Sequence, residues 1–252
     1  MKTLQTRTHL LSGASLTNLV FVLFKNRSEI SPKYLPQVLL IFITPLLLFP
    51  LYLCELIFFS ARISRIRVKK DPVFIIGHFR SGTTFMHNLL CRDSQFGFPT
   101  TYQCFVPGIF LTGKQFIKAV HKTTQPEKRP MDDAKFIYMH RNTQQILKST
   151  NKLFDRFLKL YSFQDISANE LQNNISWVFD QMISEYNDQK KLIPKHHLIE
   201  IDYDDFIREP LKTMQKIYSG MQLEGFETAK NDFEKYILEQ ASYTPDLQSL
   251  TA

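Results

Sequence analysis

Two glycines, Gly77 and Gly82, constrain the fold more than any other feature of this chain, which has only 8 glycines among its 252 residues. The apolar run Val73–Ile76 before them predicts a buried strand, and Phe85–Leu90 after them predicts a helix. A strand, a short loop and a helix in this order direct backbone N–H groups and the positive end of the helix towards one point. The sequence therefore predicts an anion-binding loop.

The loop itself reads Gly77-His78-Phe79-Arg80-Ser81-Gly82-Thr83-Thr84. It has the G-x4-G spacing of nucleotide-binding phosphate loops, but Thr83 stands where those loops carry a lysine. The positive charge lies inside the loop instead, at Arg80, which makes ATP chemistry a poor match. A planar guanidinium suits an anionic group whose bridging oxygen gains charge during transfer. The plain alternative is an ordinary strand–helix turn, and the Arg-Ser-Gly-Thr-Thr run argues against it.

The rest of the chain alternates between strand-like and helix-like patterns. Further buried strands are predicted at residues 135–140 and 197–203, and amphipathic helices at 143–161, 175–186, 210–218 and 231–239. Alternation of this kind favours a parallel sheet with helices on its faces. We expect an α/β fold of the P-loop-containing nucleotide-hydrolase-like type, with three layers and a parallel central sheet, preceded by an apolar N-terminal helical segment.

That N-terminal segment contains 17 residues without a charge, Val38–Cys54, and after Glu55 the apolar run resumes as far as Ala61. About 20 apolar residues span a bilayer, so the length is at the threshold. Pro45, Pro50 and Glu55 weaken a simple spanning helix. A spanning helix, a monotopic or re-entrant membrane helix, and a buried helix of a soluble protein are the three interpretations.

A cluster of basic residues follows the apolar segment, with five positive charges in nine residues: Arg62, Arg65, Arg67, Lys69 and Lys70. The whole chain carries a net charge of +7, which favours polyanionic partners. A solvated helix end is the alternative for the cluster. Beside an apolar run, the cluster predicts a membrane-associated protein in which this flank and everything downstream of it lie on the cytoplasmic side. The three widely spaced cysteines are consistent with that reducing compartment.

The stretch DPVFIIGHFRSGTT resembles the 5′-phosphosulfate loop of sulfotransferases that use 3′-phosphoadenylyl sulfate (PAPS), in their membrane-associated or tyrosylprotein-like branch. AKFIYMHRNTQQILKST resembles the 3′-phosphate motif of the same family, with Arg141 closing a strand and Ser149 eight positions later. The resemblance implies an enzyme that transfers a sulfuryl group from PAPS to a hydroxyl or amine acceptor at or near a membrane, without a metal. It implies that PAPS is bound by Gly77, Arg80, Ser81, Gly82, Thr83, Thr84, Arg141 and Ser149. The expected partners are PAPS, its product PAP, a membrane and a lipid or glycan acceptor, but no nucleic acid.

Two catalytic roles are implied. Arg80 would stabilise the leaving phosphate, and a base must take the acceptor proton. We assign the base to His87, one turn into the helix after the loop, although a packed or capping histidine is the simpler interpretation. Other candidates for the base are His121, Glu127, Asp132 and Asp133. Phe85 could stack on adenine or pack in the core.

The sequence departs from the family between residues 133 and 135. After RPMDD it passes directly into AKFIYMHRN, where relatives carry a substantial block with an acidic stretch and a further strand. We therefore expect residues 1–70 to form a helical region with a membrane-associating segment at about 38–61, and residues 71–252 to form a sulfotransferase-like domain that is incomplete at this point. The alternatives are a truncated, non-catalytic relative that binds PAPS, PAP or the membrane, and a P-loop small-molecule kinase.

Overall fold

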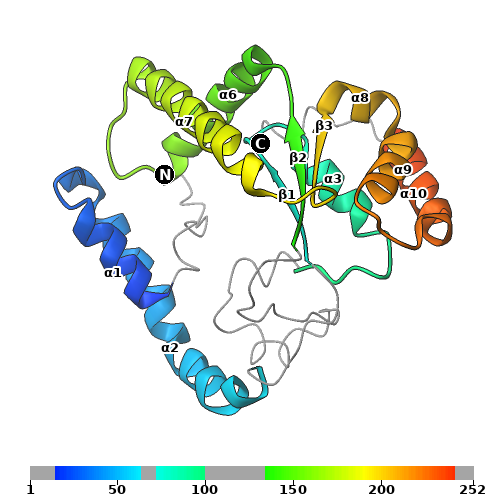
Figure 1. Cartoon of the computed structure of the whole chain (residues 1–252). Helices are drawn as coiled ribbons and strands as arrows, with labels where there is room; N and C mark the ends of the chain where they lie inside the picture. The colour runs from blue at the N-terminus through cyan, green and yellow to red at the C-terminus, as the bar shows by residue number, and fades with distance from the viewer. Residues whose placement is uncertain (1–14, 64–71, 100–133, 242–252) are drawn as a thin grey trace. The chain divides into compact units, whose positions relative to one another are not determined.

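The computed structural model describes residues 15–63, 72–99 and 134–241 (Figure 1). The described residues belong to two compact units. The first unit includes residues 15–63 and 152–172, and the second includes residues 72–97, 134–151 and 173–241. The helices α6 and α7 each begin in one unit and end in the other.

The second unit is built on a parallel sheet of three strands: β1 (Val73–Gly77), β2 (Lys135–His140) and β3 (Leu198–Asp202). The order across the sheet is β1-β2-β3, so that β2 lies in the middle (Figure 1). Ile137 is aligned with Ile75 of β1 and with Ile199 of β3. The three apolar runs are therefore the strands that the sequence predicted, and β2 has the predicted bounds.

The helices of the described chain after the first strand are α3 (Thr83–Leu90), α6 (Thr143–Tyr161), α7 (Ala168–Gln189), α8 (Tyr203–Arg208), α9 (Pro210–Gly220) and α10 (Phe226–Ala241). α6 has the predicted bounds, and α7 and α10 extend beyond theirs. α8 was not predicted, because six residues are too few for a periodic pattern. It forms because the Asp202 carboxylate caps it, accepting bonds from the backbone N–H groups of Asp204 and Asp205.

The core lies between one face of the sheet and α3, α8, α9 and α10. Its fully buried side chains come from β2, from all four helices and from the residue after α9: Met86, Leu89, Ile137, Met139, Phe206, Met214, Ile217, Met221 and Phe233. Tyr138 points to the opposite face, where its ring stacks on Tyr186 of α7 with 3.7 Å between centroids. Helices thus cover both faces, and the predicted three-layer α/β architecture with a parallel sheet is confirmed.

A buried polar contact fixes the end of α3 against α9. The Tyr218 hydroxyl donates to the buried Asp93 carboxylate, which also accepts from the Gln95 backbone N–H at 2.9 Å. Burial, together with the hydrogen bond to Asp93, raises the pKa of Tyr218, so the phenol stays protonated at neutral pH. A protonated phenol on a buried carboxylate satisfies both groups, which holds α3 and the loop before it in place.

The first unit contains α1 (Leu16–Lys25), the short 3-10 helix η2 (Pro32–Tyr34) and α2 (Leu35–Ile63). α1 and α2 contact one another, with Leu19, Val38 and Ile41 buried (Figure 1). α2 runs for 29 residues through both Pro45 and Pro50. Of the described helices, it is the one long and apolar enough to cross a membrane, judged by length and composition.

Candidate functional site: the glycine-flanked loop

The loop of residues 77–84 connects the end of β1 to the start of α3, as the sequence predicted. A Cβ atom at Gly77 would lie 2.6 Å from the Met139 carbonyl oxygen and 2.7 Å from Ser81 Oγ, so that no side chain fits there. Gly82 caps α3 in the left-handed conformation, with φ 91°, and a Cβ there would collide with the ring of Tyr203. Both glycines are therefore required by the shape of the turn.

Arg80 lies inside this loop with φ 68°, a left-handed conformation that is uncommon for a residue with a side chain. Its side chain is exposed, and its Nε donates to Ser149 Oγ on α6 at 2.9 Å. The two residues are 69 positions apart, and they belong to the two motifs that the sequence analysis identified separately. The fold thus brings the loop and the second motif into direct contact, at a backbone position where strain is typical of functional sites.

Arg141 reaches the same place from the end of β2. Its Nη1 donates to the Arg80 carbonyl oxygen at 3.3 Å, and its Nε donates to Gln145 Oε1 at 3.0 Å. Its guanidinium carbon lies 4.1 Å from the centre of the Tyr203 ring, within the range of a cation–π contact. Arg80, Arg141 and the start of α3 therefore lie together at the carboxyl ends of the strands.

The remaining loop residues differ in what they can offer a ligand. The fully buried Ser81 donates its hydroxyl to the His78 carbonyl oxygen at 2.7 Å, which closes the turn. Thr84 is exposed and Thr83 is half-buried, both at the start of α3, where the backbone N–H groups are unpaired. In this arrangement Ser81 shapes the loop, and Thr83 and Thr84 are the hydroxyls available to an anion.

His87, assigned above as the base, lies half-buried on α3, and its Nε2 is 3.5 Å from the Cys91 sulfur one turn further on. Burial raises the pKa of the Cys91 thiol to about 11, so it stays protonated at neutral pH. Phe85 packs against Phe206 and Tyr236 with centroids 5.0 and 6.1 Å away, as expected for a core residue. His121, Glu127, Asp132 and Asp133 lie outside the described residues.

Sequence reasoning missed Tyr203 and the pair that positions it. His140 is aligned with Asp202 in the β2–β3 register, and its Nδ1 lies 3.3 Å from the Asp202 carboxylate. Arg141 directly follows β2, and Tyr203 directly follows β3. The parallel register of the two strands therefore places the arginine beside the tyrosine ring. The sequence does show that each of these strands ends in a polar residue, His140 and Asp202. To infer that the two residues meet, one must know that β2 and β3 are neighbours, and the sequence did not specify the strand order.

This geometry defines an α/β protein in which two arginines and the start of a helix lie together at the carboxyl ends of the strands, an arrangement that suits a doubly anionic ligand. One anion would lie at the N-terminus of α3 beside Arg80, and a second beside Arg141. Ligands of parallel α/β sheets bind at the carboxyl ends of the strands, where these residues lie. A nucleotide with phosphate groups at two separate positions meets this requirement.

A family model described as the sulfotransferase family matches residues 72–133 and 128–228, which is more than half of the chain. The protein therefore belongs to the sulfotransferase family, and it is an enzyme of the transferase class. The matched residues contain all three strands and the complete glycine-flanked loop.

Named relatives agree with this assignment. The chain is 18% identical over 290 residues to the omega-hydroxy-beta-dihydromenaquinone-9 sulfotransferases Stf3 of Mycobacterium bovis and Mycobacterium tuberculosis, covering 79% of this chain and 75% of each relative. The crystal structure of sulfotransferase STF1 from Mycobacterium tuberculosis H37Rv superimposes with a TM-score of 0.62 at 12% identity. That superposition covers 87% of this chain and 85% of STF1, so the two proteins share a fold.

Proposed function

We propose that the protein transfers a sulfuryl group from PAPS to a hydroxyl group of a lipid at a membrane surface. The observation that carries the proposal is the convergence of Arg80 and Arg141 at the start of α3. Two separate cations match the two separate anionic ends of PAPS, the 5′-phosphosulfate and the 3′-phosphate. A nucleoside triphosphate has its phosphates in a single chain and gives Arg141 no partner of its own.

In this proposal Arg80, Thr83, Thr84 and the backbone N–H groups of α3 hold the 5′-phosphosulfate. Gly77, Ser81 and Gly82 shape the loop that presents them. Arg141 and Ser149 bind the 3′-phosphate. Ser149 also accepts a hydrogen bond from Arg80 in the structure, so it links the two anion-binding residues. No metal is assigned a role.

The chemistry requires one bond to form and one to break. The acceptor oxygen bonds to sulfur while the bond between sulfur and the bridging phosphate oxygen breaks, and PAP leaves with the negative charge. Arg80 is permanently protonated and lies where that charge develops, so it stabilises the transition state more than the bound donor. His87 is our candidate for the base that accepts the acceptor proton.

The lipid acceptor and the membrane are supported by two independent observations. The Stf3 relatives are named for a hydroxylated menaquinone, and α2 is long and apolar enough to enter a bilayer. We assign residues 1–70 to a membrane-associating region and residues 71–252 to the sulfotransferase domain. The basic cluster at residues 62–70 supports a cytoplasmic position for that domain.

We also propose that the domain lacks an internal block near residues 133–135. The two segments matched by the family model meet and overlap at residues 128–133. The alignment with Stf3 runs over 290 residues, whereas 79% of the 252 residues here is about 199. Relatives thus carry sequence that has no counterpart in this chain.

Thermal unfolding with 3′,5′-ADP, ATP and ADP tests the nucleotide assignment. At 100 times its Kd, 3′,5′-ADP should stabilise the protein by about 2.7 kcal/mol, while equal concentrations of ATP and ADP should have little effect. Sulfur-labelled PAPS with a long-chain isoprenoid alcohol in mixed micelles then tests transfer. Stabilisation by ATP alone would refute the PAPS assignment, and binding without transfer to any alcohol would refute the catalytic one.

A further inference from the structure

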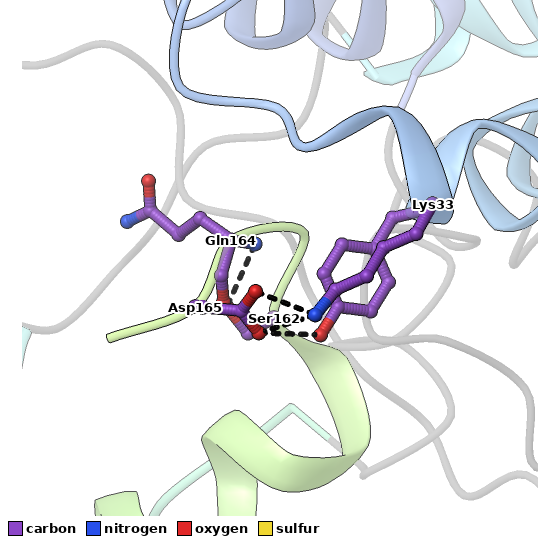
Figure 2. Close-up of polar contacts among 5 residues, drawn as sticks. Lys33, Ser162, Gln164 and Asp165 are labelled. Atoms are coloured by element: carbon purple, nitrogen blue, oxygen red, sulfur yellow. Dashed lines mark hydrogen bonds and ion pairs between the residues drawn. The ribbon is translucent and has the colours of Figure 1, made fainter. Parts of the chain in front are cut away.

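The N-terminal end of α2 is held by a segment far along the chain. Lys33 Nζ lies 2.6 and 2.5 Å from the two carboxylate oxygens of Asp165, and the Tyr34 hydroxyl donates to Asp165 Oδ1 at 3.2 Å (Figure 2). The Ser31 backbone N–H also donates to the Phe163 carbonyl oxygen at 2.9 Å. We call these contacts the tether. Both sides of the tether belong to the first compact unit.

The tether restricts how α2 can meet a membrane. If α2 spanned the bilayer, Lys33 would lie on one side and everything after Ile63 would emerge on the other. Asp165 follows α2 by about a hundred residues, so a second crossing would be needed to bring it back to Lys33. The described helices between them cannot cross: α3 has eight residues, and α6 carries Lys148, Lys152, Asp155 and Arg156. The sequence of residues 64–142 contains no run of about 20 predominantly apolar residues.

The burial pattern along α2 leads to the same conclusion. The buried residues of the helix, Val38, Ile41, Pro45 and Glu55, lie on one side of it over a span of about 26 Å. Glu55, the one acidic residue of the helix, thus points into the protein while apolar side chains point outward. The outward residues have exposed fractions of 62 to 72%: Leu39, Leu40, Leu46, Leu47, Ile57 and Phe58. A helix that lies in the membrane plane is expected to have one side against the protein and an apolar side facing outward.

α1 adds to the outward apolar surface. Phe21 and Phe24 are 65 and 67% exposed on a helix of ten residues, which is about 15 Å long and too short to cross a hydrocarbon core of about 30 Å. Apolar patches of this kind are rarely left in water. α1 and α2 therefore both expose apolar side chains. Among the described residues there is no second helix that could span a membrane beside α2.

Positive charge flanks both ends of α2. Lys25, Arg27 and Lys33 precede the helix, and the basic cluster begins at Arg62 in its last turn and continues beyond its end. A spanning helix is oriented by an excess of positive charge on one flank. Charge on both flanks is instead suited to two ends that meet the same layer of anionic headgroups.

From these observations we infer that α2 is a monotopic helix that lies in one leaflet of a lipid bilayer, with both of its ends on the same face of the membrane. The tether holds the N-terminal end on the same side of the membrane as Asp165, and the outward side chains of α1 and α2 enter the leaflet. The inference rests on the membrane association proposed above and specifies its geometry. It places the enzyme at the surface from which a lipid hydroxyl is accessible.

Site-specific labelling decides between the two topologies. Ser28 and Lys235 are both exposed, one before α2 and one on α10. Single Ser28→Cys and Lys235→Cys variants would be made in a background with Cys54→Ser, Cys91→Ala and Cys104→Ser. A membrane-impermeant maleimide would be applied to intact spheroplasts and to inverted inner-membrane vesicles of the expression host. Both positions should react in the inverted vesicles and neither in the spheroplasts.

The wild-type chain provides a second measurement that needs no variant. Trypsin added to inverted vesicles should cleave both at Lys25 or Arg27 and within the catalytic domain, whereas trypsin added to spheroplasts should cleave neither. Accessibility of the two regions from opposite sides would overturn the inference while leaving membrane association intact. Release of the protein by alkaline carbonate would overturn the inference and the membrane part of the proposed function together, and the sulfuryl-transfer assay would be unaffected.

Discussion

Arg80 is the residue on which the proposed chemistry depends most. It has a left-handed backbone and donates to Ser149, so its guanidinium is held in place before any ligand binds. A fixed cation stabilises developing charge without reorganisation during the reaction. The tight turn between Gly77 and Gly82 is what makes this placement possible.

We expect Arg80→Met to lower turnover by ~10²–10³-fold, the cost of losing one preorganised donor to the transition state. Nucleotide affinity should change far less, because the loop N–H groups remain. Arg80→Lys should recover part of the loss. Single-turnover transfer and 3′,5′-ADP binding measure the two effects, with Arg208→Met on the exposed face of α8 as the control. Turnover within a factor of about three of wild type would remove Arg80 from this role.

Arg141 should determine recognition of the 3′-phosphate. We expect Arg141→Ala to weaken binding of 3′,5′-ADP by ~1.5–3 kcal/mol, the range for a charge-assisted hydrogen bond. Adenosine 5′-phosphosulfate lacks that phosphate, so its affinity should change much less. Calorimetric titration of both ligands, with Arg208→Ala as the matched control, measures the difference. Equal losses for the two ligands would contradict the assignment.

Among the secondary-structure elements, α2 is held at its N-terminal end by a residue that lies far from it in the sequence. The tether between Lys33 and Asp165 joins residues 132 positions apart. The pKa of the Asp165 carboxyl is lowered, and that of Lys33 raised, chiefly by their shared hydrogen bond. Because the folded carboxyl has the lower pKa, its stabilising effect is present above the ordinary carboxyl pKa and is lost as the pH falls through the folded value.

Charge reversal tests the tether. We expect Lys33→Asp and Asp165→Lys each to increase hydrogen exchange at the Ser31 amide, which donates to Phe163 in the intact tether. The double variant restores an opposite-charge pair and should restore protection, measured at neutral pH in detergent micelles. Lys191→Asp, which breaks the exposed pair with Asp188 elsewhere, is the matched control. Failure of the double variant to recover protection would show that the two charges do not act together.

The observed bounds of helices and strands agree with the predicted ones where the hydrophobic pattern is clear over the whole element. β2 and α6 have their predicted bounds because an unbroken apolar run and five turns of amphipathic spacing leave no competing register. α8 escaped prediction because its stability comes from the Asp202 cap rather than from a pattern. Pro45 and Pro50 were predicted to weaken a simple spanning helix, and α2 runs through both as one helix.

At the scale of the whole molecule, one edge of the sheet bears on the proposed missing block. Among the described residues β1 pairs with β2 alone and stands at one edge of the sheet. In our proposal the missing block lies before the second motif, where a further strand would pair with β1. An edge left without such a strand would expose unpaired backbone groups beside the glycine-flanked loop, which is a liability for a parallel sheet.

The sequence by itself determined the α/β class, through its alternating strand and helix patterns, and the family, through its resemblance to known motifs. It also predicted an anion-binding loop, because the spacing of Gly77, Arg80 and Gly82 is local and each residue has a physical reason to be there. It also identified Arg141 and Ser149 as a second motif. Only the tertiary structure decided that Ser149 contacts Arg80 and that Tyr203 lies beside Arg141, since these contacts depend on strand order and register. The tether was likewise invisible in the sequence, because one exposed lysine and one exposed aspartate carry no signal until the fold brings them together.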